Sequence, residues 1–185
     1  MGRIKAIITD FDGTLVDTFY SNYHAYKEAY KYHGFELTEE QYRNCYGLRF
    51  NEFCDKMNFP NDYRNSLKSL KKRIYPNYFG YAKLNEILIK FIIFAKKQGL
   101  KTCIASTASK ENLYNMLRYF NIEEYFDIII TGENVLHGKP NPEVYNKALT
   151  MLDCDSDEVI VFEDSDVGCE AAENAGINYV KIFNF

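Results

Sequence analysis

Apolar and polar positions along the chain follow two rhythms, one typical of buried strands and one typical of amphipathic helices. Short runs of aliphatic and β-branched residues predict strands at residues 4–9, 101–105, 127–130, 159–162 and 179–182. Apolar residues that recur every three or four positions predict helices at residues 84–97, 110–120, 142–151 and 167–175. Strands that alternate with helices in this way are typical of βαβ units and a parallel sheet.

A region without predicted strands separates the first strand from the others. Tyr23, Tyr26 and Tyr30 recur there at helical spacing, and the Thr-Glu-Glu-Gln sequence that begins at Thr38 is typical of a helix start with a capping box. We predict three or four helices in this region and interpret it as an insertion into a single α/β domain.

The predicted boundaries follow from the insertion. Residues 1–17 and 80–185 are expected to form the α/β core domain, and residues 18–79 are expected to form the small helical domain.

The composition is that of a globular protein with a mildly acidic charge. Of 185 residues, 46% are hydrophobic and 26% are charged, and the formal net charge is −4. This balance argues against a nucleic acid or an anionic membrane as partner, because both attract a basic face. The five cysteines are dispersed and form no CxxC pair, so neither a disulfide framework nor a zinc site is expected.

Targeting and membrane-spanning signals are not recognised in the sequence. The apolar run before Asp10 is too short for a signal peptide. The most apolar stretch, residues 87–95, contains Lys90 and is far shorter than the roughly 20 residues that span a bilayer. We therefore expect a cytoplasmic protein, and a monomer or weak dimer.

Polar residues follow four of the predicted strands. Because the carboxyl ends of parallel strands meet at one edge of the sheet, these side chains are expected to lie close together. Crowded carboxylates repel one another unless a cation lies among them, and hard oxygen ligands suit Mg²⁺. The residues are Asp10, Asp12 and Thr14 after the first strand, Ser106 after the second, Lys139 after the third, and Glu163 and Asp164 after the fourth.

Four sequence motifs carry a family resemblance. Asp-Phe-Asp-Gly-Thr-Leu-Val-Asp at residues 10–17 resembles the first motif of haloacid-dehalogenase-type phosphatases. Ile-Ala-Ser at 104–106, Lys-Pro-Asn-Pro at 139–142 and Phe-Glu-Asp-Ser-Asp-Val-Gly at 162–168 resemble the other three, in the family's order. The resemblance implies a Rossmann-like α/β core with a small helical cap inserted after the first strand.

The resemblance also implies roles for the residues that would handle phosphate. Asp10 is similar to the nucleophile that attacks phosphorus, and Asp12 to the general acid/base. Thr14 resembles a phosphate or structural contact, and Ser106 the hydroxyl that holds a phosphoryl oxygen. Lys139 would neutralise charge between nucleophile and phosphate.

Two alternatives for the serine stay open, because the Ser-Thr-Ala-Ser run permits a shift in register. Thr107 or Ser109 could take the place of Ser106.

The implied cofactor is Mg²⁺. Asp164 resembles a metal ligand, and Glu163 is either a second ligand or an outer-shell partner of the metal. With Asp10 and Asp12, these residues form the expected metal site.

Other polar groups receive a structural interpretation. Asp17 is expected to cap a helix or to act in a hinge. The basic run is expected to be a solvated helix face. Four tyrosines of the inserted region either line a substrate pocket or form the core of the cap, namely Tyr20, Tyr23, Tyr26 and Tyr30. The basic run consists of Lys68, Lys71, Lys72 and Arg73.

The function we expect is Mg²⁺-dependent hydrolysis of a small phosphorylated metabolite. The alternative is a sugar phosphate isomerase similar to β-phosphoglucomutase. That enzyme has a cap motif of Gly, apolar, Ser and Arg, whereas residues 47–50 here are Gly-Leu-Arg-Phe. A phospho-acceptor switch fits less well because its paired acids precede the phosphorylated Asp. A dehalogenase fits less well because Asp12 and Glu163-Asp164 favour metal-dependent phosphoryl chemistry.

Overall fold

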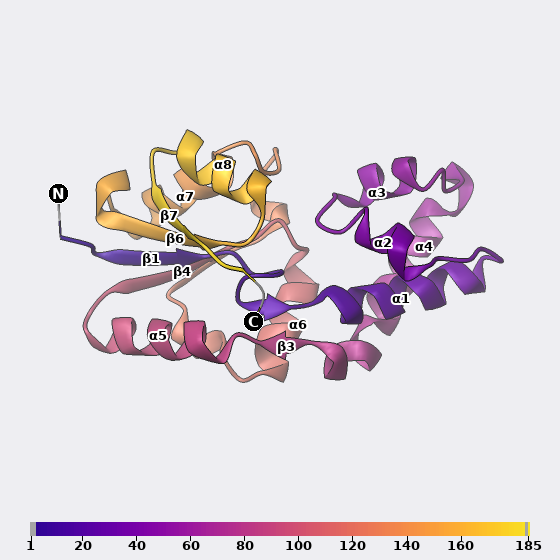
Figure 1. Cartoon of the computed structure of the whole chain (residues 1–185), viewed down its shortest axis with the longest axis horizontal. Coiled ribbons are helices and arrows are strands. Elements are labelled where there is room, and N and C mark those ends of the chain that lie inside the picture. The colour runs from indigo at the N-terminus through magenta and orange to yellow at the C-terminus, as the bar shows by residue number, and fades with distance from the viewer. Residues whose placement is uncertain (1–2, 184) are drawn as a thin grey trace. The chain divides into compact units, whose positions relative to one another are not determined.

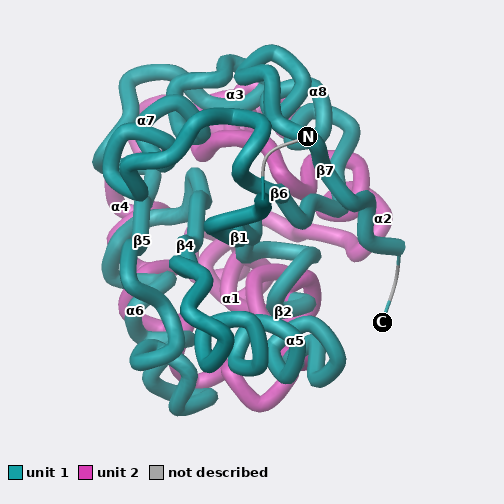
Figure 2. The backbone as a smooth tube through the Cα atoms, turned by 90° about the vertical axis from the view of Figure 1, so that its left-hand side faces the viewer, with its two compact units in different colours: residues 1–17, 84–185 teal, residues 18–83 magenta. Residues whose placement is uncertain are grey.

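The computed structural model describes residues 3–183 and 185 and divides the chain into two compact units. Unit 1 comprises Met1–Asp17 and Leu84–Phe185, and unit 2 comprises Thr18–Lys83 (Figure 2). Two short strands, β2 (Val16–Asp17) and β3 (Lys83–Leu84), pair where the chain leaves and re-enters unit 1. Unit 2 is therefore an insertion into the chain of unit 1.

A five-stranded parallel sheet forms the centre of unit 1, in the order β5-β4-β1-β6-β7. This confirms the predicted α/β fold with a parallel sheet. Central strand β1 pairs on both sides, so that Ile8 lies opposite Cys103 on one neighbour and Val161 on the other. The strands are β1 (Ala6–Thr9), β4 (Lys101–Ala105), β5 (Ile128–Ile130), β6 (Val159–Glu163) and β7 (Asn178–Lys181).

Helices cover both faces of this sheet (Figure 1). Side chains alternate between the faces of a strand, so Ile8, Cys103 and Val161 all point to the same side. There they join a buried core with Val144 and Ala171 from α7 and α8. The helices of unit 1 are α5 (Glu86–Lys97), α6 (Lys110–Tyr119), α7 (Glu143–Leu152) and α8 (Asp166–Asn174), and its 3-10 helices are η2 (Glu123–Tyr125), η3 (Gly132–Asn134) and η4 (Ser156–Glu158).

Unit 2 is a helical bundle with an aromatic core. The Tyr30 ring lies 5.9 Å from that of Phe53 and 4.6 Å from that of Phe59, measured between centroids. Thr38 and Gln41 form the predicted capping box at the start of α2. The elements are α1 (Phe19–Tyr32), α2 (Glu39–Arg43), α3 (Phe50–Lys56), α4 (Asn61–Ile74) and η1 (Tyr75–Tyr81).

The interpretation of the basic run as a solvated helix face is wrong at one position. Lys71 is only 6% exposed, because it shares the buried face of α4 with Leu67 and Ile74. Its ammonium donates to Asn22 Oδ1 at 2.6 Å and lies 3.9 Å from the centroid of the Tyr75 ring. The run of charges in the sequence did not reveal this, because the aliphatic part of a lysine side chain can pack on the apolar face of a helix.

No helix within residues 3–183 has both the length and the hydropathy needed to cross a bilayer.

Candidate active site

The register of the sheet brings the predicted site residues to one edge. Thr9, the last residue of β1, pairs with Ile104 of β4 and Phe162 of β6. The next residue, Asp10, donates its amide hydrogen to the Phe162 carbonyl at 2.9 Å. The residues that follow these strands therefore lie side by side, as expected for the carboxyl edge of a parallel sheet.

Lys139 connects three of these strand ends through its ammonium group. Its Nζ donates to Asp10 Oδ1 at 2.6 Å, to the Ala105 carbonyl at 3.2 Å and to Glu163 Oε1. An ammonium has three hydrogens, so these three acceptors define its direction. Burial alone would lower the pKa of Lys139, but electrostatic interactions with Asp10, Tyr145 and Glu163 outweigh burial and raise it.

Glu163 is fully buried, and both of its carboxylate oxygens accept hydrogen bonds. Oε1 accepts from Lys139 and from the Tyr145 hydroxyl, the latter at 2.6 Å. Oε2 accepts from the Asp164 amide at 3.2 Å and from the Ser165 amide and hydroxyl at 3.4 and 3.2 Å. These hydrogen bonds therefore fix the orientation of the buried Glu163 carboxylate.

Asp164 is held by the loop that follows β1. Thr14 Oγ1 donates to Asp164 Oδ1 at 2.7 Å. Gly13 has a φ of 94°, and a Cβ at this position would lie 2.2 Å from Asp164 Oδ2. The glycine is therefore required both for its backbone conformation and for the space that the carboxylate occupies.

Three carboxylates form a group that could hold a metal ion. Asp10, Glu163 and Asp164 can each offer an oxygen within 4.8 Å of the others. Burial raises the pKa of Asp10 well above its usual range, with Glu163 and Asp164 adding to this rise and Lys139 opposing it. Burial also raises the pKa of Asp164, against the hydrogen bond from Thr14. Hard oxygen ligands with excess negative charge fit a divalent cation.

Asp12 and Ser106 occupy the same edge of the sheet. Asp12 is half-buried in a tight loop in which the Gly13 amide donates to the Val16 carbonyl at 2.8 Å. Ser106 is 2% exposed, and its hydroxyl accepts from the Ala108 amide at 3.0 Å. Ser109, which could replace Ser106, precedes the first residue of α6.

One residue of this cluster was missed by the sequence analysis. Tyr145 is fully buried on α7, its hydroxyl donates to Glu163, and Lys139 Nζ lies 5.1 Å from the centroid of its ring. Burial raises the pKa of Tyr145, and the carboxylates of Glu163 and Asp10 add to this rise while Lys139 opposes it. The sequence could have indicated this residue, because Tyr145 stands at an apolar position of a predicted helix. A tyrosine hydroxyl that is buried there needs a hydrogen-bond acceptor.

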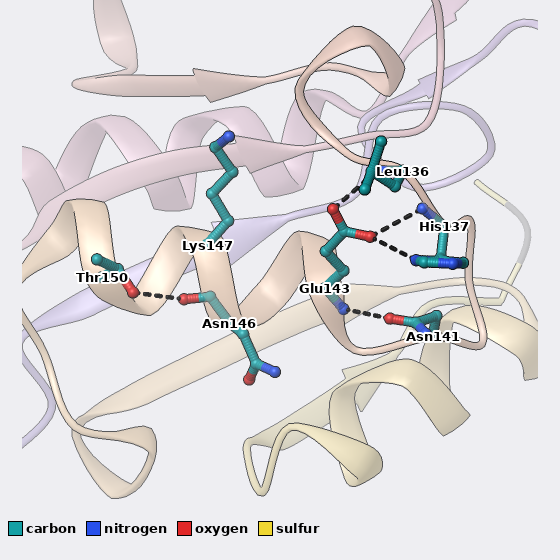
Figure 3. Close-up of a pocket in the computed structure, with 7 residues that line it drawn as sticks. All are labelled: Leu136, His137, Asn141, Glu143, Asn146, Lys147 and Thr150. Carbon is teal, nitrogen blue, oxygen red and sulfur yellow. Dashed lines mark hydrogen bonds and ion pairs between the residues drawn. The ribbon is translucent and has the colours of Figure 1, made fainter.

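The opposite, solvent-facing side of α7 carries a shallow hollow (Figure 3). Glu143 accepts from the amides of Leu136 and His137, both at 2.8 Å, and thereby anchors the loop that leads to Lys139. The hollow, of about 550 Å³, includes none of the predicted site residues. Its lining residues are Leu136, His137, Asn141, Glu143, Asn146, Lys147 and Thr150.

Comparison with known proteins identifies the family to which this arrangement of residues corresponds. A family model described as haloacid dehalogenase-like hydrolase matches residues 7–182. The chain belongs to this family. The resemblance carried by the four motifs is thus confirmed. Among curated proteins, the phosphorylated carbohydrates phosphatase of Thermotoga maritima is 31% identical over 181 residues, which cover 96% of this chain and 84% of that protein.

Solved structures share the fold over nearly the whole chain. CbbY of Rhodobacter sphaeroides in complex with phosphate has a TM-score of 0.89 and 26% identity, covering 98% of this chain and 87% of that one. A Thermotoga maritima protein identified provisionally as a β-phosphoglucomutase has a TM-score of 0.78 and 30% identity, covering 98% and 88%. The present chain is accordingly a haloacid dehalogenase-like enzyme of the phosphoric monoester hydrolase class.

Gly168 of α8 provides a test of how tightly the buried carboxylate is enclosed. A Cβ at Gly168 would lie 2.1 Å from the carboxylate of Glu163. We expect Gly168→Ala to lower the free energy of unfolding by about 1–3 kcal/mol, although alanine normally stabilises a helix interior. We also expect phosphate release to fall on the order of 10- to 100-fold, because Glu163 must move.

The matched control is Gly80→Ala. Gly80 is exposed, and nothing lies within 4 Å of a Cβ built there. Urea unfolding and a phosphate-release assay compare the two variants, and equal behaviour would contradict the tight enclosure of Glu163.

Proposed function

We propose that the protein hydrolyses small phosphorylated metabolites through a covalent aspartyl phosphate on Asp10. The observation that carries this proposal is the buried ion pair between Asp10 Oδ1 and Lys139 Nζ, at 2.6 Å, beside two further carboxylates. A phosphoryl group that reaches this edge of the sheet meets a carboxylate nucleophile and a fixed cation together. Positioning and charge neutralisation of this kind provide most of the catalysis in phosphoryl transfer.

The first step forms the covalent intermediate. With Oδ1 of Asp10 held by Lys139, Oδ2 is the oxygen that attacks phosphorus. The bond from phosphorus to the ester oxygen breaks, and Asp12 supplies the proton that the leaving alcohol takes. Asp12 suits this role because it lies two residues beyond Asp10 in the same tight loop.

The second step restores the enzyme. Asp12, now ionised, takes a proton from a water molecule, and that water attacks phosphorus. The bond between phosphorus and Asp10 breaks, so that phosphate leaves and Asp12 is protonated again for the next cycle. Ser106 would hold a phosphoryl oxygen through its hydroxyl, and Lys139 would neutralise the charge that accumulates on the oxygens.

Mg²⁺ is the cofactor we propose, held by Asp10, Asp12 and Asp164 with Glu163. The cation would neutralise phosphoryl oxygens and offset the repulsion among the carboxylates. The five hydrogen bonds that Glu163 accepts support an outer-shell role for this residue. The hydrogen bond from Thr14 to Asp164 supports a structural role for Thr14.

Unit 2 is proposed to be the cap domain that selects the substrate. Its insertion between the first and second motifs supports this assignment. Phosphorylated carbohydrates are the substrate class to test first, because the curated Thermotoga maritima relative is a phosphatase of that class. A cytoplasmic location is also proposed and is supported by five free cysteines, which suit a reducing compartment.

A sugar phosphate mutase is the second candidate, favoured by the 30% identity to the provisional β-phosphoglucomutase. A mutase must retain a second phosphate while excluding water, which requires a cation in the cap. Arg49 is the cation within residues 47–50, and it lies at the N-cap of α3, one position from the mutase pattern. This displacement favours hydrolysis.

We expect Asp10→Asn to reduce kcat by at least about 10³-fold, because an amide cannot form the aspartyl phosphate. The fold should be retained, since the substitution removes one of three crowded negative charges. Asp153→Asn is the matched control, at an exposed αL position that tolerates asparagine. A folded Asp10→Asn protein with full activity would contradict the nucleophile assignment.

Removal of the metal provides a second prediction. EDTA should abolish phosphate release, and added Mg²⁺ should restore it, because the carboxylates cannot approach a phosphate without a cation. The assay is run at constant ionic strength to separate binding of the metal from general screening of charge. Full turnover in metal-free buffer would rule out the proposed cofactor.

A substrate panel separates the two candidate functions. We expect phosphate release from simple sugar monophosphates, and no interconversion of glucose 1-phosphate and glucose 6-phosphate even with a bisphosphate primer. A coupled assay for glucose 6-phosphate is run beside a phosphate-release assay. Efficient isomerisation with negligible release would establish the mutase instead.

A further inference from the structure

We propose that Tyr145 is a positioning residue of the active site, whose hydroxyl fixes the Glu163 carboxylate so that Glu163 holds Lys139 against Asp10. The inference rests on the proposed function in one respect, namely that the reaction takes place at Asp10.

A continuous chain of short contacts connects the tyrosine to the nucleophile. The Tyr145 hydroxyl donates to Glu163 Oε1 at 2.6 Å, and the same oxygen accepts from Lys139 Nζ. Lys139 in turn donates to Asp10 Oδ1 at 2.6 Å. Each of these side chains is buried, so water does not readily replace a missing partner.

The hydroxyl determines how the lysine is shared between two carboxylates. Glu163 Oε1 accepts two hydrogen bonds, one from the phenol and one from Lys139. The phenol therefore offsets part of the negative charge of Glu163 that Lys139 would otherwise have to offset alone. Without the hydroxyl, Glu163 would attract the ammonium more strongly and could rotate about its remaining bonds. Lys139 would then be less well placed to neutralise charge beside Asp10.

Packing alone does not require a hydroxyl at this position. The other buried residues of α7 are Val144, Ala148 and Leu152, all of them apolar. Phenylalanine would fill the same space without burying a polar oxygen, which costs free energy unless the oxygen has a partner. The 2.6 Å bond to Glu163 supplies that partner, and this ties the tyrosine to the site.

The test compares Tyr145→Phe with Tyr179→Phe. Both changes remove a hydroxyl that donates to a glutamate, but the Tyr179 bond, to Glu173 at 2.8 Å, is exposed and lies outside the carboxylate cluster. We expect Tyr145→Phe to lower kcat for p-nitrophenyl phosphate on the order of 10-fold, with KM within about 2-fold of wild type. Tyr179→Phe should change neither constant by more than about 2-fold.

A double variant tests whether the tyrosine acts through the glutamate. If it does, adding Tyr145→Phe to Glu163→Gln should leave kcat at the value of Glu163→Gln alone. Wild-type kcat in Tyr145→Phe, or losses that multiply in the double variant, would overturn the proposal. Circular dichroism establishes that each protein is folded. Should Tyr145→Phe fail to fold, the double variant still tests the proposal. Its glutamine at position 163 is neutral, so loss of the Tyr145 hydroxyl no longer leaves a buried carboxylate without one of its donors.

The measurement stays separate from the test of the proposed function. p-Nitrophenyl phosphate reports hydrolysis of a phosphoric monoester, whatever the natural substrate. Turnover of this ester by Asp10→Asn would contradict the covalent mechanism, yet the comparison of Tyr145→Phe with its control would still show whether the hydroxyl affects kcat.

Discussion

The buried Lys139 ammonium is the group on which the rest of the site depends. A cation removed from water is costly unless its hydrogens meet charged or polar acceptors. Here two carboxylates and a backbone carbonyl take all three hydrogens, and each comes from a different strand end. The same bonds that offset desolvation therefore define where β1, β4 and β6 must end relative to one another.

Both faces of α7 contribute to the position of Lys139. The buried face supplies Tyr145, which contacts Glu163, while the exposed face supplies Glu143, which holds the backbone of the loop before Lys139. Two glycines complete the arrangement by leaving space for carboxylates, Gly13 beside Asp164 and Gly168 beside Glu163. The site is thus a property of the whole strand-and-helix framework of unit 1, in which small residues are as necessary as charged ones.

Much of the framework could be predicted, because its signals are local. The strand predicted at residues 101–105 coincides with β4, and the helix predicted at residues 84–97 ends at the same residue as α5, since apolar runs and helix stops depend on adjacent residues. The partners of Glu163 could not be predicted, because they come from residues far apart in the chain. Tyr145 was missed and Lys71 was misjudged for the same reason: periodicity shows which face of a helix is buried, but not which polar group that face can satisfy.

The placement of unit 2 within the chain has a consequence for how the protein is made. Strand β1, which leads into Asp10, is synthesised before its two neighbours, yet it is the central strand of the sheet, paired with β4 and β6. Its second neighbour, β6, ends at Glu163, so the pairing of β1 is completed only after that residue has been synthesised. Helical structure formed within the compact insertion would shorten the loop that this pairing has to close. Local contacts in unit 2 can therefore form early, whereas the long-range contacts that assemble the catalytic edge form late.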